Sequence, residues 1–465
     1  LLTPASLDRI VHHDTRYEKV AGVWFKTETT GVYANDNDAA LTQTSIVRKQ
    51  ASGGYQVVTE KVDARGNVTR TTTQINRGSK QITKTTTVPG VSVAGHRILV
   101  NNLIRSEQQP GVTGTTSYDY DTLGRMVQKA EPRIGSTFMD YVPNTWRIHS
   151  VNPPSGASVV YAYYGASTPQ GGRLKSATDA ANGVTYYDYD AQGHVTRMWG
   201  NSSYPIEYIY DSLGRMVKQH TFRGGSNWGS GTWPTGETAD VTNFSYDPSN
   251  GLLVTRQNAD GNQNTYTYTV RGQIATRQWA RSLSGTPIVT TYAYDPVTAE
   301  LASVSYSDDT PAIFYTYTRT GAVKNVTDAG GMRTFAYNGD LSLASESINP
   351  GGGGLYSKVI VRKYEGAGLV PGRAAGFTVQ SGTNAEYDTG ISYDANGRLS
   401  RISGPGLPGY GVEYTYEGFT GLPTGINYRE TAEGASVASV ERYYDPVRDE
   451  IGQITNNIGG TTISQ

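Results

Sequence analysis

The sequence predicts an all-β fold, an array of antiparallel β-hairpin repeats that forms one long sheet. Three observations carry this prediction: a short motif that recurs, alternation of β-branched and aromatic residues beside it, and a chain rich in glycine and tyrosine. The motif is clearest at residues 120–127, Tyr-Asp-Thr-Leu-Gly-Arg-Met-Val, and returns at residues 210–217 as Tyr-Asp-Ser-Leu-Gly-Arg-Met-Val. A unit that recurs along the chain indicates a repeat architecture.

The frame Tyr-Asp-x-x-Gly occurs in four clear copies, each followed by a cationic residue or histidine. These copies are Tyr120, Asp121, Gly124 and Arg125; Tyr189, Asp190, Gly193 and His194; Tyr210, Asp211, Gly214 and Arg215; and Tyr393, Asp394, Gly397 and Arg398. Weaker copies start at Tyr246, Tyr268, Tyr294, Tyr317, Tyr337, Tyr416 and Tyr444.

Turn chemistry explains the frame. Aspartate at the first turn position can accept a hydrogen bond from a backbone N–H two residues on, and glycine supplies the φ > 0 residue that closes a bulged hairpin loop. Three copies place proline after the aspartate, as at Asp247-Pro248, where a φ near −65° is favoured. The sequence therefore predicts that Gly193 and Gly214 have φ > 0 in hairpin turns headed by Asp190 and Asp211.

Strand signals lie on both sides of each turn. Residues 265–269, Thr-Tyr-Thr-Tyr-Thr, alternate with the period of a strand. A second, looser turn falls between frames, for example at residues 179–183 and 308–311. The predicted repeat is thus strand, tight turn, strand, looser turn, with key tyrosines about 20 to 26 residues apart.

This frame at this period resembles the YD-repeat, or rearrangement-hot-spot (Rhs), family. Its bacterial members include polymorphic toxins and the shell components of insecticidal toxin complexes, and animal teneurins are similar in the same region. The resemblance covers residues 115–450. It implies a ribbon of β-hairpins wound into a spiral, which shapes a hollow shell, open or partial in a fragment.

We divide the chain into five segments by the density of frames. The segments are an N-terminal cap or irregular start at 1–50, degenerate hairpin repeats at 51–115, the YD-repeat array at 116–345, a Gly-rich interruption at 346–390 with Gly351–Gly354, and continued YD repeats at 391–465.

Composition narrows the possible partners and compartments. The formal charge is −1 and no long basic run appears, which argues against nucleic acid or an anionic membrane as a partner. There are no cysteines, so disulfides and thiolate metal sites are excluded. No apolar run reaches the ~18–20 residues of a membrane span, and we interpret the chain as a fragment or processed product.

No catalytic, cofactor or metal site is predicted. His12, His13 and Asp14 are adjacent, but neighbours in an extended chain point to opposite faces. Residues 404–409, Gly-Pro-Gly-Leu-Pro-Gly, formally match a dinucleotide fingerprint, yet two prolines and the lack of a following helix favour a turn-rich loop. A Gly-x-Ser-x-Gly elbow is absent from the sequence. We therefore expect this chain to have no enzymatic activity of its own.

Two sets of residues leave alternatives open. Trp228 and Trp233, on a Gly- and Ser-rich insertion, could recognise a sugar or a partner, or could fold back against the ribbon. Arg125, Arg215 and Arg398 could form a ladder for an anionic ligand, but we favour hydrogen bonds to aspartates or carbonyls of the next hairpin.

Two functions follow from the resemblance. The first is a structural shell or scaffold segment of a secreted or injected Rhs-type protein, which encapsulates or presents a C-terminal toxin. The second is a cell-surface adhesion module that binds glycans or a protein receptor. Residues 442–446 resemble the start of the family's self-cleaving core motif, but residues 447–454 do not continue it. Both functions place the protein outside the cell or on its surface.

Strand arithmetic adds an expectation about size. At ~22 residues per repeat the chain would hold about 42 strands, and a ribbon of that size, wrapped as a sphere, leaves an inner radius of about 15 Å. A compact 100-residue domain needs about 17 Å. We therefore expect an open spiral wall whose strand edges are finished by flanking repeats or by other copies of the chain.

Overall fold

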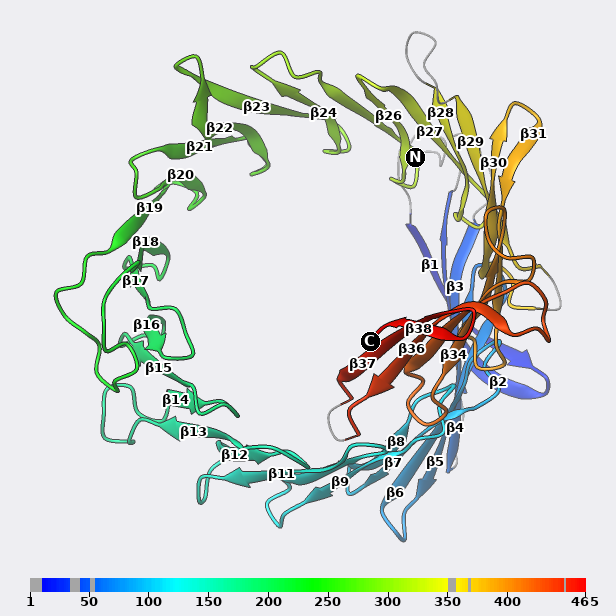
Figure 1. Ribbon diagram of the computed structural model, residues 1–465, viewed down its shortest axis with the longest axis horizontal. Helices are drawn as coiled ribbons and strands as arrows, with labels where there is room; N and C mark the ends of the chain where they lie inside the picture. The colour runs from blue at the N-terminus through cyan, green and yellow to red at the C-terminus, as the bar shows by residue number, and fades with distance from the viewer. Residues whose placement is uncertain (1–10, 34–41, 51–54, 350–356, 367–368, 447–448) are drawn as a thin grey trace. The chain divides into compact units, whose positions relative to one another are not determined.

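The computed structural model describes residues 11–33, 42–50, 55–349, 357–366, 369–446 and 449–465 (Figure 1). Two compact units divide the chain. We call Leu1–Ser136 with Tyr315–Gln465 the terminal unit and Thr137–Phe314 the central unit, and each is described by itself. The Gly351–Gly354 tract lies outside the described residues.

The terminal unit contains two runs of strands. The first run is β1 (Val11–Val20), β2 (Val23–Val32), β3 (Thr42–Gln50), β4 (Gln56–Asp63), β5 (Val68–Asn76), β6 (Gln81–Thr87), β7 (Gly95–Val100), β8 (Leu103–Gln108), β9 (Thr116–Tyr120) and β10 (Met126–Glu131). The second run is β25 (Ile313–Tyr317), β26 (Val323–Asp328), β27 (Gly331–Tyr337), β28 (Leu343–Asn349), β29 (Lys358–Tyr364), β30 (Ala374–Ser381), β31 (Asn384–Asp388), β32 (Gly390–Tyr393), β33 (Leu399–Ser403), β34 (Gly411–Tyr416), β35 (Pro423–Arg429), β36 (Ser436–Tyr444), β37 (Ile451–Ile458) and β38 (Thr461–Ser464).

The central unit holds the remaining strands, of which β11 crosses its first boundary. They are β11 (Gly135–Tyr141), β12 (Ile148–Asn152), β13 (Val159–Tyr163), β14 (Leu174–Thr178), β15 (Val184–Tyr189), β16 (Val195–Gly200), β17 (Ile206–Tyr210), β18 (Met216–Thr221), β19 (Asp240–Tyr246), β20 (Leu253–Gln257), β21 (Gln263–Tyr268), β22 (Ile274–Leu283), β23 (Thr286–Tyr294) and β24 (Leu301–Tyr306).

The predicted all-β fold is confirmed. Within each sheet, strands that follow one another in the chain pair antiparallel, as β15 does with β16 and β17 with β18. The strands form one sheet of 31 and one of 7, and the second sheet begins at β32. The described residues contain 38 strands, near the expected number, and include no helix that could cross a membrane.

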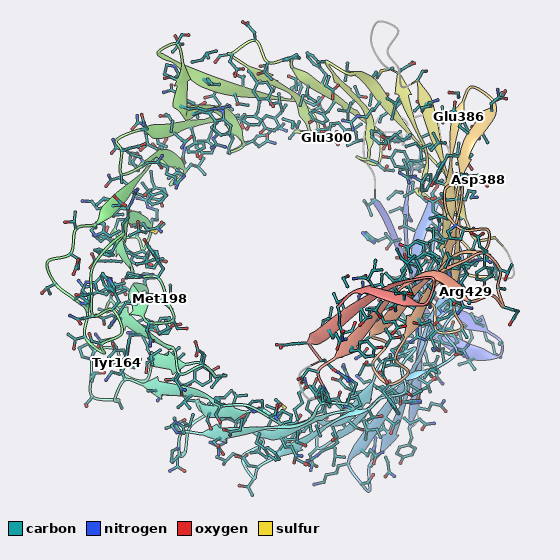
Figure 2. The ribbon with its side chains drawn as sticks, in the orientation of Figure 1. Tyr164, Met198, Glu300, Glu386, Asp388 and Arg429 are labelled. Atoms are coloured by element: carbon teal, nitrogen blue, oxygen red, sulfur yellow. The ribbon has the colours of Figure 1, made fainter. Side chains whose placement is uncertain are left out.

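The ribbon has little dry core. Figure 2 shows side chains on both faces of the strands. The largest fully buried side chains belong to threonines, Thr27 and Thr290, rather than to large apolar residues. Most tyrosines are half-buried, so their rings cover neighbouring strands while their hydroxyls reach polar partners.

Every second connection of the ribbon lies on the same edge. We call the edge with the tight Tyr-Asp turns the turn edge, and the opposite one, with the looser turns, the looser-turn edge. In the terminal unit the turn edge of β27–β37 contacts the looser-turn edge of β4–β11. We call this contact, between residues 63–135 and 338–450, the layer seam.

Backbone hydrogen bonds form the middle of the layer seam. The Ser92 N–H donates to the Ala395 carbonyl at 2.7 Å, and the Gly114 N–H donates to the Phe419 carbonyl at 2.9 Å. The acceptors are carbonyls at the tips of two tight turns, which begin with Tyr393-Asp394 and Tyr416-Glu417. Because a type I turn leaves such carbonyls pointing outward, a second layer can use them without disturbing the hairpin.

Charged side chains fix both ends of the layer seam. At one end Arg65 forms an ion pair with Asp340 and lies over the Tyr364 ring, 4.8 Å from its centroid. At the other end Arg133 forms an ion pair with Asp449 and donates to the Asp445 carbonyl at 2.6 Å. Both arginine side chains are about one-fifth exposed, at 19% and 22%, so these pairs are screened less than surface pairs.

The partners across the layer seam follow the same order along both runs of strands. Arg65 and Asp340 are 275 residues apart, Ser92 and Asn396 are 304 apart, Thr113 and Gly418 are 305 apart, and Arg133 and Asp445 are 312 apart. The two layers of the terminal unit therefore run in the same direction.

Candidate functional site

The aspartate of each clear frame organises its own turn. In the copy after β17, Asp211 Oδ1 accepts from the Leu213 and Arg215 N–H groups, both at 2.9 Å, and Oδ2 accepts from Arg215 Nε at 2.8 Å. The Arg215 N–H, followed by the Arg215 guanidinium and the Leu213 N–H, lowers the pKa of Asp211 although partial burial opposes this. The carboxylate is thus committed to holding the turn.

The turn glycines behave as the sequence predicts. Gly193 has φ = 100° and Gly214 has φ = 76°. Their N–H groups donate to the carbonyls of Asp190 and Asp211, at 3.2 and 3.0 Å. The same geometry recurs at Gly124 and Gly397, which have φ = 80° and 75°.

The frame arginines bond aspartates, as predicted, but these aspartates belong to their own turns. Arg125, Arg215 and Arg398 donate from Nε to Asp121, Asp211 and Asp394, at 2.7, 2.8 and 2.7 Å. The closed turn places the arginine, four residues after the aspartate, directly beside it. The aspartate of the same turn is therefore within reach of the guanidinium. His194 occupies the equivalent position and its Nδ1 lies 2.8 Å from Asp190 Oδ2.

Tyrosines at the tight turns connect successive hairpins, a role that the sequence analysis missed. Eight frame tyrosines and two others, Tyr163 and Tyr364, donate from the hydroxyl to the carbonyl of the first strand residue after the preceding tight turn, at 2.7–2.9 Å. The pairs are Tyr163 with Ile148, Tyr210 with Val195, Tyr246 with Met216, Tyr268 with Leu253, Tyr294 with Ile274, Tyr337 with Val323, Tyr364 with Leu343, Tyr393 with Ala374, Tyr416 with Leu399 and Tyr444 with Pro423. We call this series the tyrosine ladder.

A β-bulge aims each tyrosine at its acceptor. The register of the β17–β18 pair shifts between Ile209 and Tyr210, and the β19–β20 pair shifts between Ser245 and Tyr246. A bulge turns the side chain that follows it out of the regular strand alternation. The spacing between a tyrosine and its acceptor varies from 14 residues at Tyr337 to 30 at Tyr246, so the sequence offers no fixed interval that would identify these pairs.

Cationic side chains cover the rings of the tyrosine ladder. Arg215 lies over the Tyr246 ring, 4.7 Å from its centroid, and Arg398 lies over the Tyr416 ring at 4.6 Å. His194 packs on Tyr210 in the same way, with 4.9 Å between ring centroids. Each frame cation therefore holds its own aspartate and also the tyrosine of the next turn, an anchoring role rather than an open anion site.

We expect removal of one ladder hydroxyl, by Tyr246→Phe, to lower the free energy of unfolding by about 1 kcal/mol, the usual net value of such a hydrogen bond. Denaturant titration followed by tryptophan fluorescence measures this. Tyr204→Phe, at a side chain that is 57% exposed, is the matched control and should change little. Equal stability of the two variants would contradict a structural role for the ladder.

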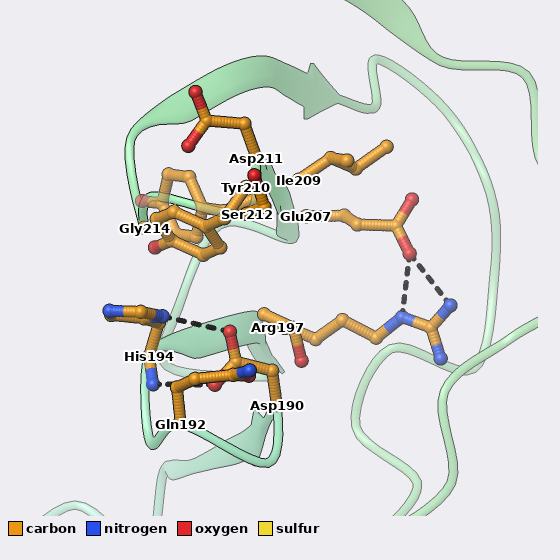
Figure 3. Close-up of a pocket in the computed structure, with 12 residues that line it drawn as sticks. Asp190, Gln192, His194, Arg197, Glu207, Ile209, Tyr210, Asp211, Ser212 and Gly214 are labelled. Atoms are coloured by element: carbon orange, nitrogen blue, oxygen red, sulfur yellow. Dashed lines mark hydrogen bonds and ion pairs between the residues drawn. The ribbon is translucent and has the colours of Figure 1, made fainter.

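A half-open pocket of about 500 Å³ lies between the turns after β15 and β17 (Figure 3). Its acidic groups already have partners. Asp190 bonds His194, and Glu207 accepts from Arg197 Nε at 2.8 Å and lies 2.8 Å from His220 Nδ1. These contacts give the carboxylate oxygens hydrogen-bond partners within the protein, as in a structural network.

Two other motifs from the sequence analysis have polar groups that already form contacts within the protein. The Gly409 N–H of the 404–409 loop donates to Glu430 Oε2 at 2.7 Å. His13 Nδ1 lies 3.1 Å from Thr30 Oγ1 across the β1–β2 pair. Among the described residues no group of three or more His, Cys, Asp or Glu side chains could hold a metal ion.

Trp228 and Trp233 fold back against the ribbon. Trp233 packs edge to face on Trp199 and Phe222, with centroid distances of 5.4 and 5.5 Å, and Arg197 lies over its ring at 5.1 Å. Trp228 packs on both Phe222 and Trp233. The recognition of a glycan or receptor by this loop stays a prediction, and neighbouring side chains occupy the ring faces that such a ligand would use.

Comparison with known proteins adds a family match. Residues 189–226, which run from the last residue of β15 through β16, β17 and β18, match the RHS Repeat family. The resemblance predicted from the Tyr-Asp frames is confirmed there. No curated protein matches the chain.

Several solved structures are similar to this chain over most of its length. A crystal structure of TcdB2-TccC3-TEV shares 14% identity, covers 94% of this chain and 28% of that chain, and has a TM-score of 0.35. TcdB2-TccC3 without its hypervariable C-terminal region shares 11%, with coverage of 97% and 32% and a TM-score of 0.35. The Photorhabdus luminescens Tc holotoxin pore with TccC3 mutation D651A shares 11%, with coverage of 94% and 32% and a TM-score of 0.30. This chain spans about a third of the length of each.

Proposed function

We propose that this chain, which carries RHS repeats, is a wall segment of an Rhs-type shell that encloses or presents a C-terminal toxin segment. The observation that carries the proposal is the layer seam. A ribbon of hairpins one strand layer thick cannot bury a core, but stacking one layer on the next produces a continuous wall. The RHS Repeat match at residues 189–226 supports the same assignment.

The chemistry of the side chains fits a wall. The frame aspartates, cations and tyrosines are all used in turns or between hairpins, so the residues that recur most often have structural partners. We propose no catalytic activity for this chain. A shell that delivers a toxin works outside the producing cell, and we propose secretion or surface display on that basis.

The adhesion alternative rests on Trp228 and Trp233, and no contact in the structure favours it. The Trp228 indole N–H donates to the Gly224 carbonyl at 3.2 Å, and the Trp233 ring packs on Trp199, Phe222 and Trp228. A sugar platform needs an open ring face. We therefore place the scaffold role first.

Protease protection tests the proposed function. The complete gene product should keep any segment that follows residue 465 intact when protease is added, because the wall excludes the enzyme. A variant that breaks the layer seam at both ends, Arg65→Ala with Arg133→Ala, should expose that segment to cleavage. Arg223→Ala is the control, since Arg223 is 84% exposed and lies outside the seam.

Two results would contradict the shell function. One is a downstream segment that is cut equally fast with and without the wall. The other is glycan-array binding by residues 1–465 that disappears in a Trp228→Ala, Trp233→Ala variant, which would support adhesion instead.

A further inference from the structure

The residue that closes each tight turn decides what covers the tyrosine of the next turn. We call it the closing residue, because its carbonyl accepts from the N–H of the first turn residue, as the Arg398 carbonyl does from Asp394 at 2.8 Å. In two turns of the layer seam the closing residue is an arginine. Arg373 lies over the Tyr393 ring, 4.0 Å from its centroid, and Arg398 lies over the Tyr416 ring at 4.6 Å. These two rings are therefore covered from within their own run of strands.

Two other turns of the layer seam close with a residue that cannot cover a ring. We call β4–β11 the first layer of the seam and β27–β37 the second layer. In the second layer the Ser342 and Leu422 carbonyls accept from the first residue of their turns, both at 2.8 Å, so these residues stand at the arginine position. Serine is too short to reach the next ring, and leucine carries no charge. Among the residues that the structure describes, no cation of the second layer lies over the rings that follow, Tyr364 and Tyr444.

Arginines of the first layer cover both of these rings. Arg65 lies over the Tyr364 ring, 4.8 Å from its centroid, and Arg133 lies over the Tyr444 ring at 5.8 Å. A Cβ atom at Gly372 would overlap the Arg65 guanidinium, so this glycine leaves room for the incoming side chain. Each ladder tyrosine of the layer seam that has no closing arginine therefore has an arginine of the other layer instead.

The first-layer arginines also act on the acidic groups of these turns. Arg65 forms an ion pair with Asp340, which lies in the first of the two turns. Glu417 heads the second turn. Burial raises the pKa of Glu417, but hydrogen bonds within the turn and the charge of Arg133 lower it overall. Each first-layer arginine thus replaces a closing arginine toward both the acid and the ring.

We propose that the rings of Tyr364 and Tyr444 are binding sites for arginine side chains of the first layer, and that the closing residues set the register in which the two layers meet. A ring that its own closing arginine covers offers a second guanidinium a like charge instead of a free face. An arginine of the first layer can therefore bind only where the closing arginine is missing. This inference concerns the terminal unit and does not depend on what the wall encloses.

The order of open and covered rings makes one register better than its neighbours. A shift by one hairpin in one direction would bring Arg65 to the covered ring of Tyr393. A shift in the other direction would bring Arg133 to the covered ring of Tyr416. Specific interfaces use such unfavourable contacts to exclude alternatives.

Leu422→Arg tests the proposal at one end of the seam. The new arginine should cover Tyr444 from its own layer and displace Arg133. Amide hydrogen exchange of the 465-residue chain reports the result at the Gly114 N–H, which donates across the seam to the Phe419 carbonyl. We expect exchange there to become roughly tenfold faster or more, the factor that loss of a cation–π contact and its ion pair implies. Arg133→Ala should have an effect of the same size.

A double variant distinguishes displacement of Arg133 from damage to the turn. If Leu422→Arg acts by displacing Arg133, adding Arg133→Ala should change the exchange no further, whereas independent effects would multiply. Leu422→Gln, which is long but uncharged, should leave exchange at Gly114 as in the wild type.

Leu252→Arg is the matched control for the arginine itself. Leu252 closes a turn of the same length in the central unit, where its carbonyl accepts from the Asp247 N–H at 2.8 Å. This variant should leave exchange at Gly114 unchanged. Circular dichroism confirms that each variant is folded, and Ser342→Arg, measured at the Ser92 N–H, replaces Leu422→Arg if the latter does not fold.

Three outcomes would overturn the proposal. They are wild-type exchange in the variant with the added closing arginine, effects of Leu422→Arg and Arg133→Ala that multiply, or an equal acceleration by Leu422→Gln or Leu252→Arg. The exchange is measured without any segment after residue 465, so failure of this proposal can be told apart from failure of the shell function.

Discussion

Gly200→Val should lower the free energy of unfolding of the central unit by roughly 3–4 kcal/mol, from about 1–2 for the backbone conformation and the rest for steric overlap. Gly200 ends β16, is buried and has φ = 153°. A Cβ atom there would overlap the carbonyl oxygen of Val184 on the paired strand. Backbone cannot rotate away as a side chain can, so the strands must separate.

Tryptophan fluorescence during denaturant unfolding measures this effect. Five of the six tryptophans, all except Trp24, lie between residues 137 and 314, so the signal reports mainly on the central unit. Gly214→Val is the matched comparison, because its Cβ would meet only the tip of the His194 ring, at 3.0 Å. We expect a loss of about 1–2 kcal/mol at that turn. If the two variants were equally stable, the close approach of the Val184 carbonyl to Gly200 would not be what excludes a side chain at this position.

Acid should weaken the layer seam at the Asp340 end. Burial raises the pKa of Asp340, but hydrogen bonds from the Arg65 guanidinium and from Ser342 outweigh it and lower the pKa to about 2. A carboxyl whose folded pKa lies below its unfolded value stabilises the fold above the unfolded pKa. That stability, about 2 kcal/mol here, is lost as the pH falls from about 4 to about 2.

Urea unfolding of Asp340→Asn and of the wild type across this pH range tests the prediction. The variant should be less stable at neutral pH, and the difference should shrink as the pH falls from about 4 to about 2 and vanish below that, where the carboxyl of Asp340 is protonated in the folded protein as well. Asp119→Asn, at a side chain that is 67% exposed, controls for general loss of negative charge. A stability difference that persists unchanged at low pH would mean that the Asp340 side chain stabilises the seam through packing and not through its charge.

Local chemistry made much of this fold predictable. The positive φ at Gly193 and Gly214 and the aspartates that head their turns follow from a few adjacent residues, and strand alternation follows from a period of two. The same reasoning placed the partner of Arg215 in the next hairpin, whereas the turn closes around Asp211 and brings that carboxylate within reach of the guanidinium. Residues 11–32 lack a good frame yet form two regular strands, since pairing with a neighbour can set register without a motif.

Contacts between distant residues could not be predicted in this way. The tyrosine ladder depends on the lateral distance between hairpins and on a bulge at each tyrosine, which the frame does not specify. The layer seam joins Ser92 to Ala395, and neither residue carries a signal that identifies the other. Trp228 and Trp233 could stack on a ligand or on the ribbon, and only their packing on Phe222 decides between these positions in the described structure.

The tyrosine ladder gives the ribbon a direction of assembly. Every hydroxyl reaches back to a carbonyl made earlier in the chain, so a hairpin that leaves the ribosome meets an acceptor already in place. Because domains and repeats form from the N-terminus during synthesis, each new hairpin can be fixed as soon as it emerges. The ribbon would then grow by one hairpin at a time onto the part that is already folded. If synthesis stopped, the last hairpin would have its own tyrosine bonded, and the carbonyl that the next tyrosine uses would still lack its partner.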